Sequence, residues 1–218
     1  MRQLSVYFLF LLCSTIWLSC DDEELFVGAN TLATEERFVA VFSGLRIADD
    51  MQATVTFGDE VEVLLTANDN LLDRIRTEVN GGILEVSLLR GNYRDVDISL
   101  AITLPDLSYL KATDDAEITA GTFLDLDELQ LEASDDAKIS VMGTVATLNL
   151  RSTDGAAINV FDLLATNCDA QVSDGADAET TVQNNLSGRV TDGGDLFYRG
   201  NPTIDVSISD GGELIDAN

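Results

Sequence analysis

Six aspartates recur at nearly constant spacing in the second half of the chain, and their carboxylates are the first candidates for chemistry. The intervals between them are 21, 19, 20, 18 and 18 residues, and the residues are Asp114, Asp135, Asp154, Asp174, Asp192 and Asp210. Carboxylate oxygens are the ligands that Ca²⁺ prefers in proteins. The calcium candidates are therefore the first four of these aspartates and the two that directly follow a leading aspartate, namely Asp114, Asp115, Asp135, Asp136, Asp154 and Asp174. The chain contains no calcium loop with regularly spaced glycines.

The same aspartates are also compatible with a purely structural role. Each follows Ser or Thr and precedes Asp or Gly and then Ala or Gly, as in the sequences KATDDAEI and RSTDGAAI. Such residues favour tight turns, because Asp can hydrogen-bond the backbone and Gly accepts a positive φ. Aspartates stacked about 5 Å apart would repel by roughly 1 kcal/mol per pair even in water. Either the side chains splay apart with raised pKa values, or cations bridge them.

The residues that flank each corner predict the elements that position it. Apolar residues alternate at period two on both sides of the aspartate, which is the pattern of a β-strand. One repeat of about 20 residues then holds strand, corner and strand, so the chain is predicted to be all-β, with a parallel β-solenoid over six repeats in residues 105–218. No helical period interrupts residues 96–218. Cys168 falls in an apolar column with Leu129 and Leu148, which predicts a buried spacer.

Residues 38–104 predict longer, antiparallel excursions that open the solenoid and cap its core. Hairpins are expected at Gly58–Asp59 and around residues 80–82, and residues 96–104 alternate as one strand. The sequence Ala48-Asp49-Asp50-Met51 reads as a degenerate copy of the corner. The predicted fold is therefore one domain over residues 38–218.

The composition excludes several classes of function. The chain has no histidine, which removes Ser–His and Cys–His nucleophile pairs and the common zinc sites. Its net charge of −27 argues against binding nucleic acid or an anionic membrane, both of which need clustered Lys and Arg. The charge favours a cation or a basic partner.

The first residues predict export and attachment to a membrane. Residues 1–19 carry one base, an apolar run and then a small residue, which is typical of a secretory signal. The Ser19–Cys20 pair resembles a bacterial lipobox, so Cys20 is expected to become the lipidated first residue and to anchor the protein in the outer membrane. The following CDDEE resembles surface-export signals of Bacteroidetes lipoproteins, with residues 20–37 as an acidic tether. Display on the outside is expected, with a periplasm-facing protein as the alternative.

Several stretches together resemble a known family. They are FSGLRI at 42–47, DNLLDRIRTEV at 69–79 with GGILEV after it, ITLPDLSYLKAT at 102–113, and the repeated corners. Over about residues 38–216 they are similar to the head GIN domain of putative auto-transporter adhesins. The resemblance implies a right-handed β-helix-like solenoid and adhesion, and brings no catalytic or binding residues. In that family the corner is usually Ser-Gly-Ser-Gly-like, whereas here Asp replaces the first Gly.

Three functions follow as alternatives. The favoured one is a non-enzymatic lipoprotein of the cell envelope that binds an extracellular or envelope ligand, as an adhesin or binding module. The second is a calcium-stabilised scaffold. The third is a carbohydrate-active β-helix enzyme, which is disfavoured because evenly spaced aspartates give no local singularity, and fold alone implies no chemistry. Strand edges left free at the solenoid ends also suggest self-association.

Overall fold

The protein is almost entirely made of β-strands. The computed structural model describes residues 24–218, so the predicted signal segment and Cys20 lie outside the described residues. Among the described residues, no helix is long and apolar enough to cross a membrane. The only helical turn that they contain is η1 (Leu72–Arg74). The predicted all-β solenoid is confirmed, with about five turns.

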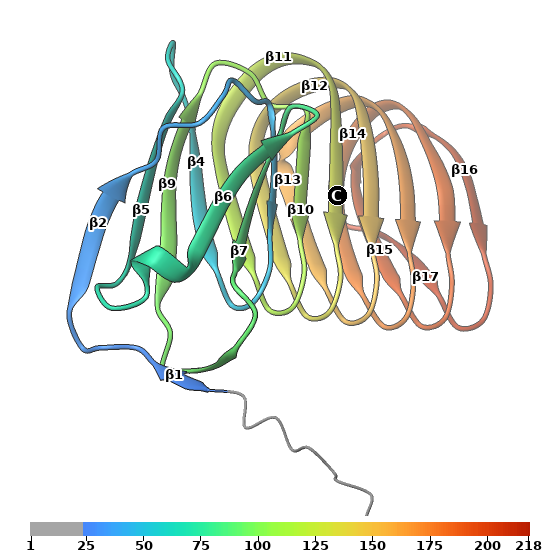
Figure 1. The fold of residues 1–218 in the computed structure, drawn as a ribbon. Coiled ribbons are helices and arrows are strands. Elements are labelled where there is room, and N and C mark those ends of the chain that lie inside the picture. Colours follow the sequence, from blue (N-terminus) through green and yellow to red (C-terminus); the bar gives the residue numbers. More distant parts are fainter. Residues whose placement is uncertain (1–23) are drawn as a thin grey trace, which may run out of the picture.

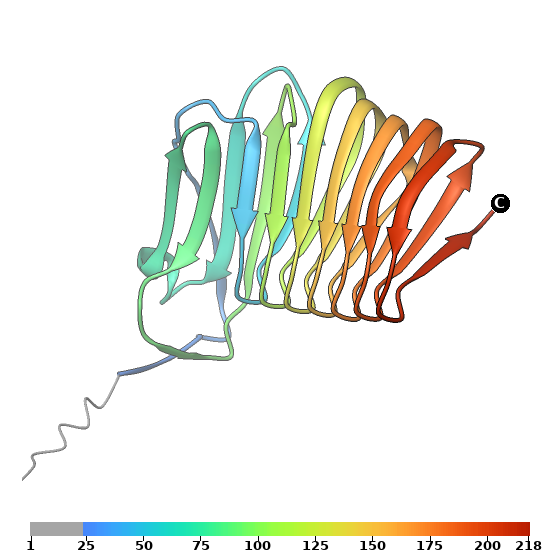
Figure 2. The ribbon, with the colours of Figure 1, turned by 90° about the vertical axis from the view of Figure 1, so that its right-hand side faces the viewer.

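Parallel coils form the second half of the molecule, stacked along one axis (Figures 1 and 2). Four long strands bend so that each lines two walls of the solenoid: β11 (Glu117–Ala133), β12 (Lys138–Ser152), β13 (Ala157–Val172) and β14 (Asp177–Val190). The last coils divide the same path among three shorter strands, β15 (Asp195–Gly200), β16 (Thr203–Ile208) and β17 (Glu213–Asp216). All pairs within this half are parallel and keep the repeat in register, so equivalent residues stack on one another.

The core is a set of apolar columns inside the coils, as the period-two pattern predicts. Ile118, Ile139 and Ile158 are partners in adjacent coils, and all three are fully buried. The residue two positions after each leading aspartate is small, and Ala116, Ala137 and Ala156 have no exposed surface. A larger side chain in that column would meet the neighbouring coil, which explains why only Ala and Gly occur there.

The repeated corner is a tight turn with two residues in the left-handed region. Asp114 and Asp115 have φ of 55° and 61°, and the N–H of Ala116 donates to the carbonyl of Thr113 at 3.2 Å. Positive φ at both central positions defines a type I′ turn, in which Asp-Gly is strongly favoured. In addition, the N–H of the second turn residue donates to the leading aspartate's carbonyl of the next coil, as from Asp115 to Asp135 at 2.9 Å. The corners thus form a continuous backbone ladder.

The structure differs from the expected corner in two details. The leading aspartate itself takes a positive φ, which the turn interpretation placed only on the residue after it. In the described part of the chain, the Ser or Thr hydroxyl before the leading aspartate does not hydrogen-bond the backbone of its turn. Instead, Ser134 Oγ donates to Asp135 Oδ2 at 2.7 Å, and Ser173 makes the same contact with Asp174 at 2.6 Å.

The first half continues the two walls and then turns back on itself. Its strands are β3 (Gly44–Ile47), β4 (Gln52–Phe57), β5 (Glu62–Asn68), β6 (Ile75–Asn80), β7 (Ile83–Leu88), β9 (Ile98–Leu104) and β10 (Tyr109–Ala112). The hairpin around residues 80–82 is confirmed as β6 and β7. The corner at Asp49–Asp50 is also confirmed, with φ of 60° and 55°.

The other predicted hairpin, at Gly58–Asp59, is wrong. β4 and β5 do not pair with each other, because β9 lies between them, parallel to β4 and antiparallel to β5. Every second residue of 96–104 is apolar and points toward the core. β9 can therefore occupy the position beside β4 that the predicted hairpin assigned to β5.

Part of the expected tether belongs to the fold. β1 (Leu25–Val27) pairs with β8 (Asn92–Arg94), and β2 (Leu32–Glu36) pairs antiparallel with β5. Asn68 is buried and donates to the carbonyl of Ala29 at 2.7 Å, which fixes the segment between the two strands. From Leu25 onward the chain therefore covers the first wall rather than only linking it to a membrane.

Candidate binding face

One wall of the solenoid presents a broad, regular array of polar side chains. We call it the polar face; it consists of the outward residues of β3, of β10, of β16 and of the C-terminal halves of β11 to β14. Counted back from the leading aspartate, its rows lie one, three, five and seven residues before the corner. Because the coils are in register, each row runs straight along the solenoid axis.

Hydrogen bonds between neighbouring coils hold many of these side chains in place. Asn185 Nδ2 donates to Asn167 Oδ1 at 2.7 Å, and Asn149 Nδ2 donates to Glu128 Oε1 at 2.7 Å. Ser187 Oγ donates to Asp169 Oδ2 at 2.9 Å. A face whose side chains are ordered before binding loses less conformational entropy when a ligand arrives.

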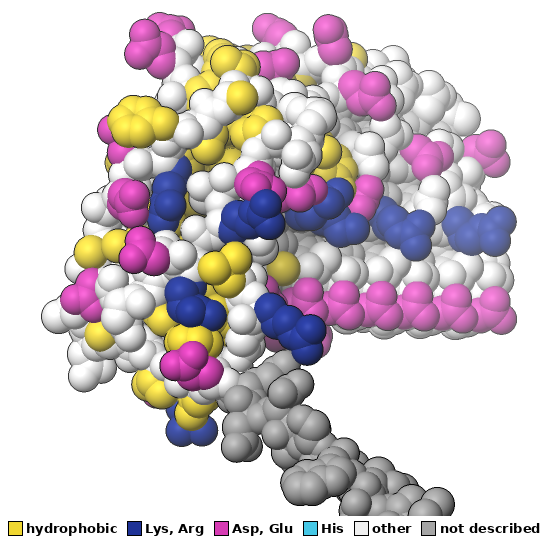
Figure 3. All heavy atoms as spheres, viewed as in Figure 1, with side chains coloured by type: hydrophobic (Ala, Val, Ile, Leu, Met, Phe, Trp, Pro, Cys, Tyr) yellow, Lys and Arg dark blue, Asp and Glu magenta, His cyan; other side chains and the backbone are white. Residues whose placement is uncertain are grey.

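The row three residues before the corner carries most of the positive charge of this wall. In Figure 3 it is the line of Lys and Arg side chains that runs above the straight row of acidic corners. Its first two members are ion-paired: Arg46 with Glu85 at 2.7 Å, and Lys111 with Glu132 at 3.2 Å. Burial would raise the pKa of Glu132, but the hydrogen bond and charge of Lys111 outweigh it and lower that pKa.

The next two cations of this row, Arg151 and Arg189, make no ion pair with any residue of the described chain. Arg151 Nη1 donates to Gln171 Oε1 at 3.4 Å, a long contact, and both arginines are exposed. They lie two coils apart, with Gln171 between them. In a chain with 39 acidic and 12 basic residues, two unpaired guanidinium groups on one face are notable.

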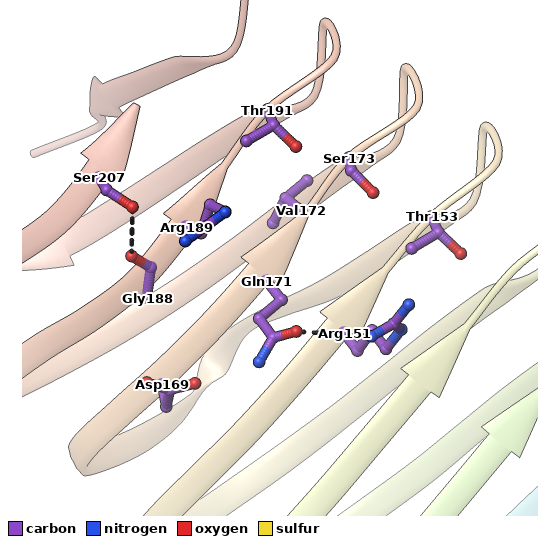
Figure 4. Close-up of a pocket in the computed structure, with 10 residues that line it drawn as sticks. All are labelled: Arg151, Thr153, Asp169, Gln171, Val172, Ser173, Gly188, Arg189, Thr191 and Ser207. Atoms are coloured by element: carbon purple, nitrogen blue, oxygen red, sulfur yellow. Dashed lines mark hydrogen bonds between the residues drawn. The ribbon is translucent and has the colours of Figure 1, made fainter. Parts of the chain in front are cut away.

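A shallow hollow of about 480 Å³ lies between these two arginines (Figure 4). Its lining includes Asp169, Gln171 and the hydroxyl row of Thr153, Ser173 and Thr191. The inward column four residues before the corner becomes smaller beneath the hollow, from Leu150 to Ala170 and then Gly188.

Position 188 accepts only glycine. Its φ is 133°, and a Cβ atom on it would lie 1.9 Å from the carbonyl oxygen of Ala170. The backbone of the two coils therefore comes together closely at the hollow, and no other residue fits without a shift of the strand. The inward column therefore has its smallest member next to Arg189.

The predicted calcium residues lie along the corner row instead. Asp114, Asp115, Asp135, Asp136, Asp154 and Asp174 are all exposed, and each has a positive φ. Within residues 24–218, no group of three or more Asp, Glu or Cys side chains is arranged to hold a metal ion. The calcium assignment therefore stays a prediction, whereas the turn geometry supplies a structural reason for every leading aspartate.

Repulsion along the corner row is visible at its first member. Burial, followed by the charges of Asp114 and Asp50, raises the pKa of Asp49. We therefore expect that Asp135→Asn and Asp154→Asn together leave the free energy of unfolding unchanged or raise it by a few tenths to about 1 kcal/mol per site, since Asn also tolerates a positive φ. Urea unfolding at low and at 1 M salt measures this, and the gain should shrink at high salt. A clear loss of stability would mean that the carboxylates have an attractive partner such as a cation.

Acidic side chains also stack on the opposite wall. Asp177, Asp195 and Glu213 are register partners, and burial together with the charge of Asp195 raises the pKa of Asp177. Burial also raises the pKa of Glu179, with Arg199 opposing and Asp177 and Asp162 adding to the shift.

These raised pKa values predict a pH dependence of stability. A carboxyl group with a higher pKa in the folded than in the unfolded state holds its proton more tightly when folded, so stability increases as the pH falls from neutral through the raised pKa toward 3.8. Asp177→Asn should raise the free energy of unfolding at pH 7, and with it the melting temperature; the gain should be less than about 1 kcal/mol because solvent screens this group. Glu132→Gln should do the opposite, because the lowered pKa of Glu132 marks stability that is present above pH 4.5. Melting curves from pH 4 to pH 8 distinguish the two signs.

Cys168 is confirmed as a buried spacer. It is 2% exposed, and burial raises the pKa of its thiol to about 12. Its nearest polar partner is Thr180, whose Oγ1 lies 3.8 Å from the sulfur. A thiol in this state is protonated at neutral pH and is a poor nucleophile.

Sequence reasoning missed the polar face. The alternation in the repeat identifies the inward columns, but it assigns no role to the polar residues between them. One signal was present, because Arg151 and Arg189 occupy the same position in alternate repeats and Gly188 is the smallest member of its apolar column. Nothing in the sequence shows whether a cation on such a face has an acidic partner, which depends on the register between coils.

Comparisons with known proteins agree with this architecture. A putative adhesin from Bacteroides fragilis is 18% identical, with a TM-score of 0.65 over 87% of this chain and 98% of that one. A putative adhesin from Parabacteroides merdae is 15% identical, with a TM-score of 0.56 over 89% and 99%. A putative lipid binding protein from Parabacteroides distasonis is 15% identical, with a TM-score of 0.57 over 89% and 100%. At these identities the likeness concerns the fold.

No curated protein matches the chain significantly. The sequence does match a family over residues 41–202, and the description of that family is putative auto-transporter adhesin, head GIN domain. This range covers most of the chain and ends within the last coils of the solenoid. The chain therefore belongs to the head GIN domain family of putative auto-transporter adhesins.

Proposed function

We propose that this protein is a non-enzymatic lipoprotein of the cell envelope, and that it binds an external ligand through the polar face. The observation that carries the proposal is the hollow on that face, which two arginines without an ion pair in the described chain flank. Membership of an adhesin family and the likeness to putative adhesins and a putative lipid binding protein support a binding module. A rigid solenoid suits this task, because it presents many contacts in a fixed order.

Attachment to the outer membrane through a lipid on Cys20 belongs to the same proposal. The Ser19–Cys20 pair and the acidic residues that follow support it, with surface exposure preferred over a periplasm-facing position. Protease treatment of intact cells tests the orientation, since an outward-facing solenoid would be digested without lysis. Cys20→Ala provides the control, and it should release the protein from the membrane fraction.

Deletion of the gene tests the binding function itself. We expect cells without the protein to attach less well to their natural surface, and purified protein from residue 21 onward to compete with attachment of wild-type cells. Equal attachment with and without the protein, together with no competition, would contradict the proposal.

The enzyme alternative has no observation of this structure in its favour. Three carboxylates of the polar face already accept hydrogen bonds: Glu128 accepts from Asn149, Glu132 from Lys111, and Asp169 from Ser187. Release of reducing ends from a polysaccharide by the purified protein would nevertheless overturn our choice.

The calcium-stabilised scaffold remains the second candidate. Exposed aspartates in a straight row motivate it, and melting with calcium and with a chelator tests it. Our proposal expects no difference in melting temperature, since backbone hydrogen bonds already hold the corners. A calcium-dependent rise would favour the scaffold, because a ligand that binds only the folded state raises its stability.

A second copy of this chain is also a proposed partner, at the solenoid's C-terminal coil. Ile204 and Ile208 are 43% and 52% exposed, whereas Leu186 and Val190, their partners one coil earlier, are fully buried. No residue of the described chain covers this edge. Antiparallel pairing of β16 with its copy about Val206 would place isoleucines opposite each other and avoid opposing Asp205 to itself.

Sedimentation velocity at several concentrations tests this contact. We expect a dimer that Ile208→Lys converts to a monomer, while Leu164→Lys, at a residue 37% exposed elsewhere, leaves it intact. A wild-type monomer at all concentrations would contradict the contact.

A further inference from the structure

We propose that the hollow between Arg151 and Arg189 binds the carboxylate of an acidic sugar chain that lies along the polar face. This inference rests on the proposed binding function and names the chemical class of its ligand. It is carried by three features of the hollow: the two unpaired guanidinium groups, the amide and hydroxyl groups between them, and the single carboxylate at its edge.

The guanidinium groups define the charge of the ligand. Arg presents planar, forked N–H donors that match a carboxylate, and in a protein with 39 acidic residues an arginine without an acidic partner is a free donor set. Arg151 and Arg189 stand two coil steps apart, about 10 Å at the spacing of stacked strands. A chain that places a negative group near each of them would meet both, and a single carboxylate between them would meet Gln171 as well (Figure 4).

The remaining lining favours a sugar over a bare polyanion. Thr153, Ser173 and Thr191 line the hollow with hydroxyl groups, which exchange hydrogen bonds with sugar hydroxyls in either direction. Asp169 also lines it, and its carboxylate accepts hydrogen bonds from sugar hydroxyls, which a polyphosphate does not offer. The combination of two cations, one carboxylate and several neutral polar groups therefore fits a sugar acid.

The shape of the hollow agrees with a ligand that lies flat. The inward column beneath it consists of the small residues Ala170 and Gly188, and Gly188 is itself partly exposed and lines the hollow. Ser207 Oγ donates to the carbonyl of Gly188 at 3.3 Å, which fixes the edge toward the last coil. A sugar chain that runs along the solenoid axis would pass over successive coils without a steric obstacle.

The strong net negative charge of the protein does not prevent an acidic sugar chain from binding in the hollow. The acidic corners lie three residues along the strand from the arginine row, roughly 10 Å at 3.3 Å per residue. That distance exceeds the Debye length of about 8 Å at physiological ionic strength. Contact with the guanidinium groups is short-ranged, so binding is expected at 0.15 M salt and is expected to weaken when salt is reduced and the corner charges are less screened.

Isothermal titration calorimetry with oligogalacturonate tests the proposal. The protein from residue 21 onward should bind it, and should bind the methyl-esterified oligomer, which has the same sugars without charge, at least tenfold more weakly. The variant R151Q/R189Q should lose at least tenfold in affinity for oligogalacturonate, whereas R94Q, at an exposed arginine on β8 outside the polar face, should bind like wild type. Inorganic polyphosphate is the comparison for a bare polyanion, and it should bind more weakly than oligogalacturonate.

Three results would overturn this ligand class: no oligogalacturonate binding by wild type, equal binding of the methyl ester, or an unchanged affinity of R151Q/R189Q. Circular dichroism checks that the double variant keeps its fold, as expected for two exposed side chains. The failure of this inference is distinguishable from failure of the proposed function. If purified protein still competes with cell attachment and R151Q/R189Q competes equally well, the protein binds another ligand; if neither competes, the binding function itself is contradicted.

Discussion

Ile139→Ala is expected to lower the free energy of unfolding by about 2–5 kcal/mol. Ile139 is fully buried in the middle of the solenoid, and its partners in the adjacent coils are Ile118 and Ile158, which are buried as well. Removing its side chain leaves a cavity that coils on both sides would have to close together. Because the backbone ladder of the corners fixes the coil spacing, the site can relax only slightly, and the loss should fall in the upper part of that range.

Chemical unfolding of the wild type, Ile139→Ala and Ile139→Val measures this loss. The valine variant removes one methyl group and should cost only about 0.5–1.5 kcal/mol. If the alanine variant lost no more than the valine variant, the interior columns would not be packed as described.

Gly143→Ala is expected to destabilise the protein by more than about 3 kcal/mol, by strain rather than by loss of packing. Its φ is 136°, and a Cβ atom there would lie 1.7 Å from the carbonyl oxygen of Phe123, its register partner in the preceding coil. The obstacle is backbone, so no change of rotamer relieves it. The two coils would have to separate where β11 and β12 already shift register.

The matched control is Gly81→Ala, at the turn of the β6–β7 hairpin. Gly81 also has a positive φ, of 59°, but nothing lies within 4 Å of the added Cβ atom. Only the intrinsic cost of a left-handed residue remains, about 1–2 kcal/mol. Thermal and urea unfolding of the two variants separates backbone conformation from close approach between coils; equal losses would contradict the stacking at Gly143.

The second half of the fold could be predicted from sequence because each of its constraints repeats. Every coil needs two residues with a positive φ, then a small residue, with apolar side chains alternating on both sides, so six imperfect copies report the same geometry. Positions such as Ala137 and Ile139 then follow from their column alone. Periodic stacking converts a local pattern into a three-dimensional one, since each coil contacts only its neighbours.

The first half could not be predicted to the same depth, because its pairings join segments far apart in the chain. The sequence at Gly58–Asp59 is compatible with a hairpin, and only the competition with β9 for the same edge decides against it. Likewise, β2 finds its partner β5 about 30 residues away. Local sequence patterns predict where the strands of this half lie in the chain, but they do not predict the order of the strands in the sheet.

The polar face could not be predicted from the sequence, for a related reason. Lys111 and Arg151 occupy the same column of the repeat, yet only Lys111 has a carboxylate partner, Glu132 in the next coil. Glu132 is the register partner of both cations, and its carboxylate pairs with Lys111, so the column does not show which of the two cations is left without an ion pair. The alignment of repeats places these residues in one row, but their pairing appears only when the coils are known to stack in register.

The claim that binding occurs through the polar face is tested most directly by two variants on the same strand. Gln171 and Asn159 are both exposed residues of β13, but Gln171 lies on the polar face and Asn159 on the opposite wall. Cells that display Gln171→Trp should attach as poorly as cells without the protein, and cells that display Asn159→Trp should attach like wild type. Normal attachment with Gln171→Trp, or loss of attachment only with Asn159→Trp, would contradict our account.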